Sequence, residues 1–259
     1  MSTTQVMMHG YDLDGMMWIL VMTELAIAQP VNEQPTQPSI ADAQALANQC
    51  TGPQSCEFTC WEKAVRLLEP TDRGGVRIAC YTQGESHGPI VSWHPNGRKE
   101  GVGFSAMGIP VGGYVAWHPN GKAAATGEWA EGHLHGTLTT WHPNGALESQ
   151  GSWDRGVQTG MVRYWHDNGQ LEEVGTWHAR QPEGPVFSWF ADGTRKARAS
   201  YSAGLAQGVW REWYPSGKRQ TVARYKEGHL VRQRCWARSG KQKICPDPKG
   251  TQSADTTAE

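Results

Sequence analysis

The chain has 259 residues, a formal net charge of −1, and 13 Trp and 31 Gly beside only four Phe. A dedicated nucleic-acid binder would be strongly basic, so the charge argues against that class and no nucleic-acid partner is expected. The composition indicates aromatic and glycine periodicity rather than an ordinary aliphatic core.

Residues 1–28 have features of a signal peptide. An apolar run from Met16 to Met22 precedes Ala26-Ile27-Ala28, which has the small-x-small form of a cleavage site, although no Lys or Arg precedes the run and Glu24 follows it. The run is shorter than the about 20 apolar residues of a membrane-spanning helix, so no transmembrane segment is predicted. We therefore expect export to the periplasm, the cell envelope or the medium, and a cytoplasmic location if the signal is not real.

The segments outside the predicted array differ in composition. Residues 29–49 are rich in Gln, Pro, Asn and Ala, which predicts a linker with at most a short helical turn near Asp42. Residues 246–259 are small and polar and are predicted to be a disordered tail.

Residues 50–79 are predicted to form a Cys-containing helical cap. Trp61, Val65 and Leu68 have helical spacing, and Pro70 would end a helix over 58–68. A cap of this kind covers the apolar face and unpaired edge of a terminal repeat.

Six cysteines lie at the two ends of the predicted array: Cys50, Cys56, Cys60, Cys80, Cys235 and Cys245. An even number in these positions predicts disulfides and an oxidising compartment. We expect Cys235–Cys245 as one bridge and two bridges among the first four, whose three possible pairings stay open. No pair has the two-residue gap of a zinc knuckle, so no metal site is predicted.

A five-residue frame, Trp141-His142-Pro143-Asn144-Gly145 in its clearest form, recurs along the chain. Successive frames are 24 residues apart (117 − 93 = 24), and a worn copy at Trp236 follows after 23 (236 − 213 = 23). A fixed period of this length is typical of a repeat architecture. The Trp and Gly residues of the frames are predicted to be structural: Trp93, Trp117, Trp141, Trp165, Trp189, Trp213, Gly97, Gly121, Gly145, Gly169, Gly193 and Gly217.

Each unit is predicted to be a β-hairpin that turns at Asn-Gly. A type I′ turn needs positive φ at both central residues, and Asn144-Gly145 would supply them. This turn predicts the strand register, in which His142 lies opposite Leu147.

The register predicts two columns of cross-strand pairs. In the first, a large ring covers a bare glycine: Gly112–Trp129, Gly136–Trp153, Gly160–Trp177, Gly184–Tyr201 and Gly208–Tyr225. In the second, an apolar residue faces a small one, as interlocking packing requires: Ile90–Gly103, Tyr114–Gly127, Leu138–Gly151, Val162–Gly175, Val186–Ala199 and Trp210–Ala223.

The run from Gly151 to Gly160 (GSWDRGVQTG), followed by Tyr164-Trp165 and Asn168-Gly169, resembles the MORN-type repeat. It is most similar to the variant found in bacterial proteins often described as antitoxin-like components of toxin–antitoxin systems, and the resemblance covers about residues 80–240. It implies an all-β fold, an elongated single-sheet array of antiparallel β-hairpins over 80–245. It also implies no enzymatic activity and a binding or scaffolding surface, in some members for anionic phospholipid.

Four histidines form a column that invites a metal hypothesis: His94, His118, His142 and His166. Equivalent residues of successive hairpins lie about 10 Å apart, since two strands of about 4.8 Å separate them. Metal–nitrogen bonds are about 2 Å, so neighbours cannot share one ion, and packing over the turn is predicted instead. The hairpin Trp residues are likewise predicted to pack rather than to stack on sugars. No catalytic, cofactor-binding or metal-binding residues and no cofactor are predicted.

The C-terminal part of the array is strongly basic. Between Gly193 and Lys243 there are thirteen Lys and Arg against Glu212 and Glu227, a balance of 13 − 2 = +11. Such a segment can attract an anionic partner, although it is also typical of a solvated sheet end. The binding candidates are Arg195, Lys196, Arg198, Arg211, Lys218, Arg219, Arg224 and Lys226.

These features together predict an exported, disulfide-capped, non-enzymatic scaffold that binds a protein or an anionic phospholipid surface through its sheet. Two alternatives stay open. One is an antitoxin-like component that neutralises a toxin protein, and the other is a structural cell-envelope protein that assembles edge to edge.

Overall fold

The computed structural model describes residues 9–11, 17–19, 37–61 and 63–246. The chain divides into a unit that ends at Thr36 and a unit that begins at Gln37. In the first unit, β1 (His9–Tyr11) pairs antiparallel with β2 (Met17–Ile19). Most of the predicted signal peptide and all but the first residue of the predicted tail lie outside the described residues, so both stay predictions.

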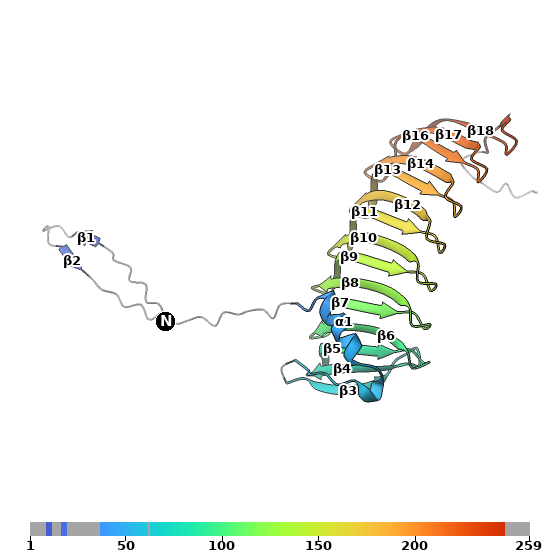
Figure 1. Cartoon of the computed structure of the whole chain (residues 1–259). Helices are drawn as coiled ribbons and strands as arrows, with labels where there is room; N and C mark the ends of the chain where they lie inside the picture. The colour runs from blue at the N-terminus through green and yellow to red at the C-terminus, as the bar shows by residue number, and fades with distance from the viewer. Residues whose placement is uncertain (1–8, 12–16, 20–36, 62, 247–259) are drawn as a thin grey trace, which may run out of the picture. The chain divides into compact units, whose positions relative to one another are not determined.

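The second unit is one open antiparallel sheet of 17 strands (Figure 1), in which strands pair in chain order and β14 pairs with both β15 and β16. Short connections keep sequential strands adjacent, so strand order follows chain order. The predicted fold class is confirmed. The strands are β3 (Val65–Pro70), β4 (Val76–Thr82), β5 (Glu85–Trp93), β6 (Lys99–Ala106), β7 (Ile109–Trp117), β8 (Ala123–Ala130), β9 (His133–Trp141), β10 (Leu147–Asp154), β11 (Val157–Trp165), β12 (Leu171–His178), β13 (Gln181–Trp189), β14 (Arg195–Ser202), β15 (Leu205–Ala206), β16 (Gly208–Trp213), β17 (Arg219–Lys226), β18 (His229–Trp236) and β19 (Gln242–Lys243).

The Pro-Asn-Gly turn differs from the predicted type. The Gly145 amide donates to the His142 carbonyl at 2.8 Å, and the His142 amide donates to the Ala146 carbonyl at 2.8 Å. Of the turn residues only Gly145 has a positive φ, +91°. This is a type I turn with Pro143 at its second position, followed by a left-handed glycine. The predicted type I′ turn is wrong because it needs a positive φ at Asn144 as well as at Gly145, and Asn144 does not have one.

A β-bulge corrects the register that this turn would otherwise impose. Leu147 pairs with Trp141 instead of with His142, its predicted partner. Glu148 is the extra residue of the bulge and has no partner in the register. From Thr140–Ser149 onwards the pairing is the predicted one. The longer turn and the bulge therefore cancel, and both predicted columns of pairs are present.

The first column contains glycine for a different reason from the predicted one. Its five glycines have φ between +70° and +75° and lie where the pairing shifts, so the bent backbone requires them. Four of them have no aromatic atom within 4 Å of the site of an added Cβ, and the nearest atoms at Gly112 belong to Pro38, so ring cover is wrong for this column. Rings instead cover two glycines of the second column: Tyr114 would lie 2.7 Å from a Cβ at Gly127, and Trp177 would lie 2.8 Å from one at Gly175.

Type I′ turns are present at the other end of each hairpin. Glu131 and Gly132 connect β8 to β9 with φ of +52° and +77°. The same pair of positive φ values recurs between the following hairpins. Ala179-Arg180 is the exception in composition, because Arg180 takes the glycine position at φ +67°.

The N-terminal helix is not where the spacing of apolar residues placed it. Helix α1 spans Ile40–Gln49 and begins at Ser39, whose side chain forms a capping box with Asp42. A single 3₁₀ turn, η1, follows at Pro53–Ser55. The segment predicted to be helical contains β3, which makes six register pairs with β4. Pairing with β4 therefore outweighed the helical spacing of apolar residues in this segment.

No described helix is long and apolar enough to cross a membrane.

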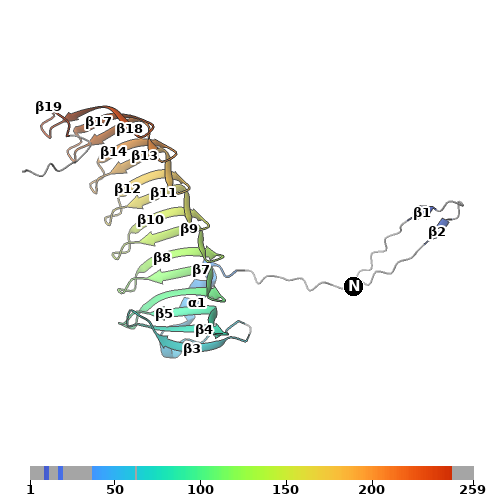
Figure 2. The same ribbon diagram turned by 180° about the vertical axis from the view of Figure 1, so that it is seen from behind.

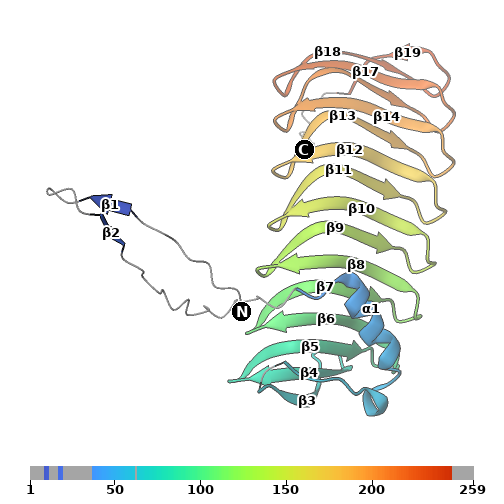
Figure 3. The same cartoon turned by 60° about the vertical axis from the view of Figure 1, so that its left-hand side comes forward.

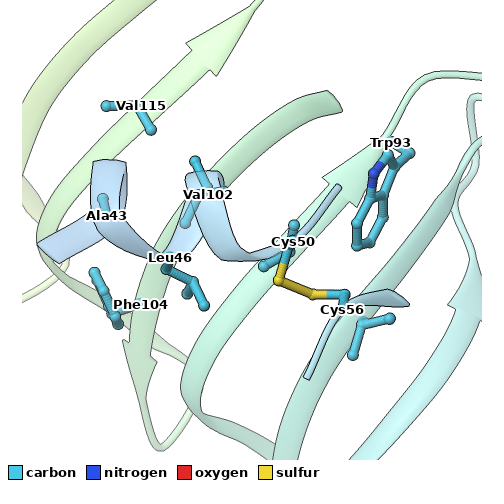
Figure 4. Close-up of a cluster of buried hydrophobic side chains, with 11 residues drawn as sticks. Ala43, Leu46, Cys50, Cys56, Trp93, Val102, Phe104 and Val115 are labelled. Atoms are coloured by element: carbon cyan, nitrogen blue, oxygen red, sulfur yellow. A yellow bond between two sulfur atoms is a disulfide. The ribbon is translucent and has the colours of Figure 1, made fainter. Parts of the chain in front are cut away.

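Helix α1 covers one face of the sheet, mainly at β6 and β7 (Figure 3), and lies behind the sheet in the reverse view (Figure 2). We call this the helix face. The opposite face, on which Tyr114 and Trp129 lie, is called the aromatic face. Ala43, Leu46 and Ala47 are buried on one side of α1 and pack into a cluster with residues such as Val102 and Val115 (Figure 4). This cluster is the main core, because the rest of the sheet has no second layer among the described residues.

All six cysteines are paired. The bridges are Cys50–Cys56, Cys60–Cys80 and Cys235–Cys245. The predicted C-terminal bridge is confirmed, and the open choice among the first four cysteines is resolved.

Candidate functional site

A row of directly paired residues runs along the helix face, and we call it the central row. Directly opposite residues of an antiparallel pair point to the same face, so every member belongs to one line across the strands. In order from β4 to β18 its members are Ile78, Val91, Val102, Val115, Thr126, Thr139, Gln150, Arg163, Val174, Phe187, Arg198, Arg211, Val222 and Arg234.

The chemistry of the central row changes along the sheet. Its first four members are aliphatic and buried, and they lie under or beside α1. Two Thr and one Gln follow. From Arg163 to Arg234 arginines and apolar residues share the row, and they are half-buried or exposed.

The structure brings five of the eight predicted basic residues together on this face. Arg198 and Arg211 are adjacent in the central row, and Arg224 lies beside it, opposite Val209. The guanidinium groups of Arg195 and Arg219 lie 5.3 Å from the ring centroids of Trp213 and Trp236. The Arg198 guanidinium similarly lies 5.4 Å from the Phe187 ring. Aromatic rings therefore hold three of these cations in place.

The other three predicted candidates are not part of this group. Burial raises the pKa of Glu173 and Lys196 opposes that rise, so Lys196 lies near Glu173, which pairs with Ser188 on the aromatic face. The Lys218 ammonium donates to the Ser239 carbonyl at 3.4 Å, at the edge formed by the turns. Lys226 pairs with His229 at the opposite edge.

Three further arginines of the helix face were outside the predicted set: Arg163, Arg232 and Arg234. Arg163 lies before the basic segment, yet it occupies the same repeat position as Phe187 (187 − 163 = 24) and Arg211 (211 − 187 = 24). Aligning the repeats by position would have found it, whereas counting charge along the chain did not.

The basic group has little charge compensation of its own. The ion pairs recorded among the described residues involve Arg73, Arg77 and histidines up to His166. Glu212 pairs with Ala197 on the aromatic face, whereas Glu183, opposite Thr176, shares the helix face and accepts the Ala203 amide at 2.6 Å. Arg198 and Arg211 are direct cross-strand neighbours, an arrangement that destabilises a sheet.

The histidine column has a structural role. Each Nε2 lies 2.7–2.9 Å from the carbonyl oxygen of the Trp that begins the next frame: His94 to Trp117, His118 to Trp141, His142 to Trp165 and His166 to Trp189. A carbonyl only accepts, so Nε2 carries the proton. The histidines thus connect successive hairpins, and no described group of three or more His, Cys, Asp or Glu is placed to hold a metal.

The hairpin Trp residues pack along the helix face. Trp93 is fully buried beside the cap, whereas the later ones are half-buried. The Nζ atom of Lys99, which occupies the repeat position of Arg195 (195 − 99 = 96, four periods of 24), donates to the Ala47 carbonyl of α1. This contact places that repeat position on the helix face.

Comparison with known proteins identifies the repeats. Three segments match the MORN repeat variant: residues 134–155, 158–179 and 206–227. They lie between β9 and β17 and include four of the helix-face arginines, Arg163, Arg211, Arg219 and Arg224. No curated protein matches the chain.

Proposed function

Because the chain is a MORN-type repeat protein and such repeats are generally non-enzymatic modules, we propose that it is a scaffold that binds an anionic protein or phospholipid surface. The binding surface is the helix face of the C-terminal hairpins. The observation that carries this proposal is the adjacent pair Arg198–Arg211 in a basic row with little charge compensation.

The energetics of the row support a binding role. Two like charges directly opposite each other weaken a sheet, and an anionic partner removes that repulsion. Apolar residues beside the charges, including Val209 at 38% and Met161 at 50% exposure, add area that a partner can bury. A surface that only kept the sheet soluble would need neither feature.

The disulfides support an exported location. Three bridges in one chain are typical of an oxidising compartment. We therefore place the binding partner in the cell envelope or outside the cell, and the cytoplasmic antitoxin-like role is the less favoured one.

A charge-reversal comparison tests the proposed surface. Arg198→Glu/Arg211→Glu changes the helix face, and Lys218→Glu/Arg238→Glu makes the same charge change at the turn edge. Retention on immobilised polyglutamate and on phosphatidylglycerol vesicles is measured at low and high salt. We expect the first variant to lose on the order of tenfold in affinity, since each basic residue contributes about 1 kcal/mol. Equal losses in both variants would contradict a defined binding face.

The first edge of the sheet favours a second candidate function, edge-to-edge assembly. Among the described residues strand β3 pairs with β4 alone, and it exposes Val65 by 62%, Leu67 by 48% and Leu68 by 57%. Exposed apolar edges of this kind pair with other strands. Light scattering after size exclusion should then show a dimer that Leu67→Lys converts to monomer, and a wild-type monomer at high concentration would rule this candidate out.

A further inference from the structure

The sheet already binds one helix on the central row, and this contact shows how the face accepts a ligand. Helix α1 is ten residues long, about 15 Å, and crosses the strands near β6 and β7 (Figure 4). Its buried residues Ala43, Leu46 and Ala47 have i, i+3, i+4 spacing. Lys99 adds a hydrogen bond to the Ala47 carbonyl. An amphipathic helix therefore fits across these strands.

The same row continues beyond α1 with a different chemistry. From Arg163 to Arg234 it crosses β11, β12, β13, β14, β16, β17 and β18. Six steps of about 4.8 Å give a length of about 29 Å, which a helix of about 19 residues would span. Nothing among the described residues packs over this part of the row as α1 does over the first part.

We infer that the central row from Arg163 to Arg234 binds an acidic amphipathic helix of a partner protein, laid across the strands as α1 is. This inference rests on the proposed function and names the class of partner. The arginines of the row favour carboxylate side chains on the partner helix. The Val and Phe residues of the row favour apolar side chains at the positions between those carboxylates.

The row also specifies the order of residues in that helix. One helical turn rises about 5.4 Å and one strand step is about 4.8 Å, so a helix laid along the row places about one turn on each strand and drifts by only about 4 Å over six steps. Successive turns then meet Arg163, Val174, Phe187, Arg198, Arg211, Val222 and Arg234. The matching helix presents acidic, apolar, apolar, acidic, acidic, apolar and acidic residues in that order.

A helix fits these observations better than a membrane does. A membrane surface needs only positive charge and makes no use of the apolar members of the row or of their order. A helix on the row contacts the half-buried Val174, Phe187 and Val222, which lie in line with the arginines. The two partners therefore differ in their dependence on these apolar residues.

The test uses the full-length, oxidised chain and a labelled synthetic peptide with the order of residues given above. A control peptide of equal composition has the same residues in a different order, in which two acidic residues meet apolar members of the row. Fluorescence anisotropy measures affinity, and circular dichroism measures the helix gained on binding. We expect the first peptide to bind at least about tenfold more tightly than the control, since two misplaced charges cost more than 1.4 kcal/mol.

Variants of the protein then locate the peptide. Arg198→Gln/Arg211→Gln removes both charges together with their mutual repulsion, so it stays folded and should still lose the peptide. Lys218→Gln/Arg238→Gln should keep it. Phe187→Ala should weaken binding at high salt as well as at low salt, because its contribution is apolar.

Each result decides between the inference and its premise. Equal affinity for the two peptides would overturn the inference that the row binds an acidic helix. So would a loss of peptide binding in Lys218→Gln/Arg238→Gln alone. If phosphatidylglycerol vesicles bind through Arg198 and Arg211 while neither peptide does, the helix inference fails and the proposed anionic function stands. If neither vesicles nor peptides depend on these arginines, both fail.

Discussion

At the scale of single residues, the repeated frame is a set of contacts between successive hairpins. His142 donates to the Trp165 carbonyl, and the Asn144 amide donates to the Asp167 carbonyl. The Asn144 carboxamide oxygen also accepts the Ala146 amide within its own turn. The His and Asn of the frame therefore connect successive repeats, and no ligand is needed to explain them.

Replacing one histidine of the column should destabilise the array. His142→Phe keeps the ring and removes the donor to the Trp165 carbonyl, which should lower the free energy of unfolding by about 1 kcal/mol. Thermal unfolding measures the change. His178→Phe, at an exposed position near a type I′ turn, is the matched control and should have no effect. A shift of equal size in both variants would contradict the proposed link.

Glu173 should make stability depend on pH. Burial on the aromatic face and then the neighbouring Glu172 raise its pKa above the ordinary value of 4.5, although Lys196 opposes the shift. A carboxyl with a raised pKa in the folded state loses stability as pH rises through that pKa. Glu173→Gln should therefore be more stable than wild type at neutral pH.

The difference between wild type and Glu173→Gln should shrink below pH 4.5, where the carboxyl is protonated in both states. Urea unfolding at neutral and at acidic pH measures it. A constant difference at both would show that the substitution acts through packing rather than ionisation.

At the scale of elements, the hairpin interfaces are not equivalent. The junction from β14 to β16 is irregular, because the short β15 interrupts it and only Ala197–Glu212 and Arg198–Arg211 pair directly. Phe190 lies at this junction, in the repeat position that His166 occupies in the frame before it (190 − 166 = 24). Its side chain has no hydrogen-bond donor to offer the next frame. Tyr214 provides one again in the next frame, where its hydroxyl donates to the Trp236 carbonyl at 2.8 Å.

Introducing a donor should strengthen this junction. Phe190→His is expected to add a hydrogen bond to the Trp213 carbonyl and to stabilise the C-terminal hairpins by about 1 kcal/mol. Hydrogen exchange should slow in β16 and β17 and stay unchanged in β5 and β6. Uniform or absent protection would show that the irregularity has another cause.

At the scale of the whole molecule, stability depends on how the two ends are covered. One end has α1, two disulfides and the buried cluster, and the other has Cys235–Cys245 over the last hairpin. Repeats contact only their neighbours, so opening can begin at either end and spread inward. The disulfides oppose this opening.

Removing the bridges should have unequal effects. Cys60–Cys80 closes 20 residues and Cys80 is fully buried, whereas Cys235–Cys245 closes 10 residues next to the free edge. Cys60→Ser/Cys80→Ser should lose about 3 kcal/mol, and the C-terminal double variant should lose less. Thermal unfolding compares them, and intact mass of the protein from its native host should show three disulfides. Six free thiols there would argue for the cytoplasmic alternative.

The sequence by itself determined the repeat period, the strand register beyond the bulge, and the C-terminal disulfide. These follow from local chemistry: a turn every 24 residues sets which residues face each other, and side-chain volumes agree with that pairing. Even the wrong turn type left the register intact, because the bulge after Leu147 compensates for the longer loop.

Only the tertiary structure decided where the helix lies and which arginines share a face. Val65–Pro70 became a strand because β4 had an edge to pair, and Ile40–Gln49 became a helix because its Ala and Leu side had a row of aliphatic residues to cover. Likewise Arg163 joined Arg198 and Arg211 while Lys196 and Lys218 did not. Side-chain direction alternates along each strand, so charge that is contiguous in sequence divides between faces, and only cross-strand pairing brings distant residues into one row.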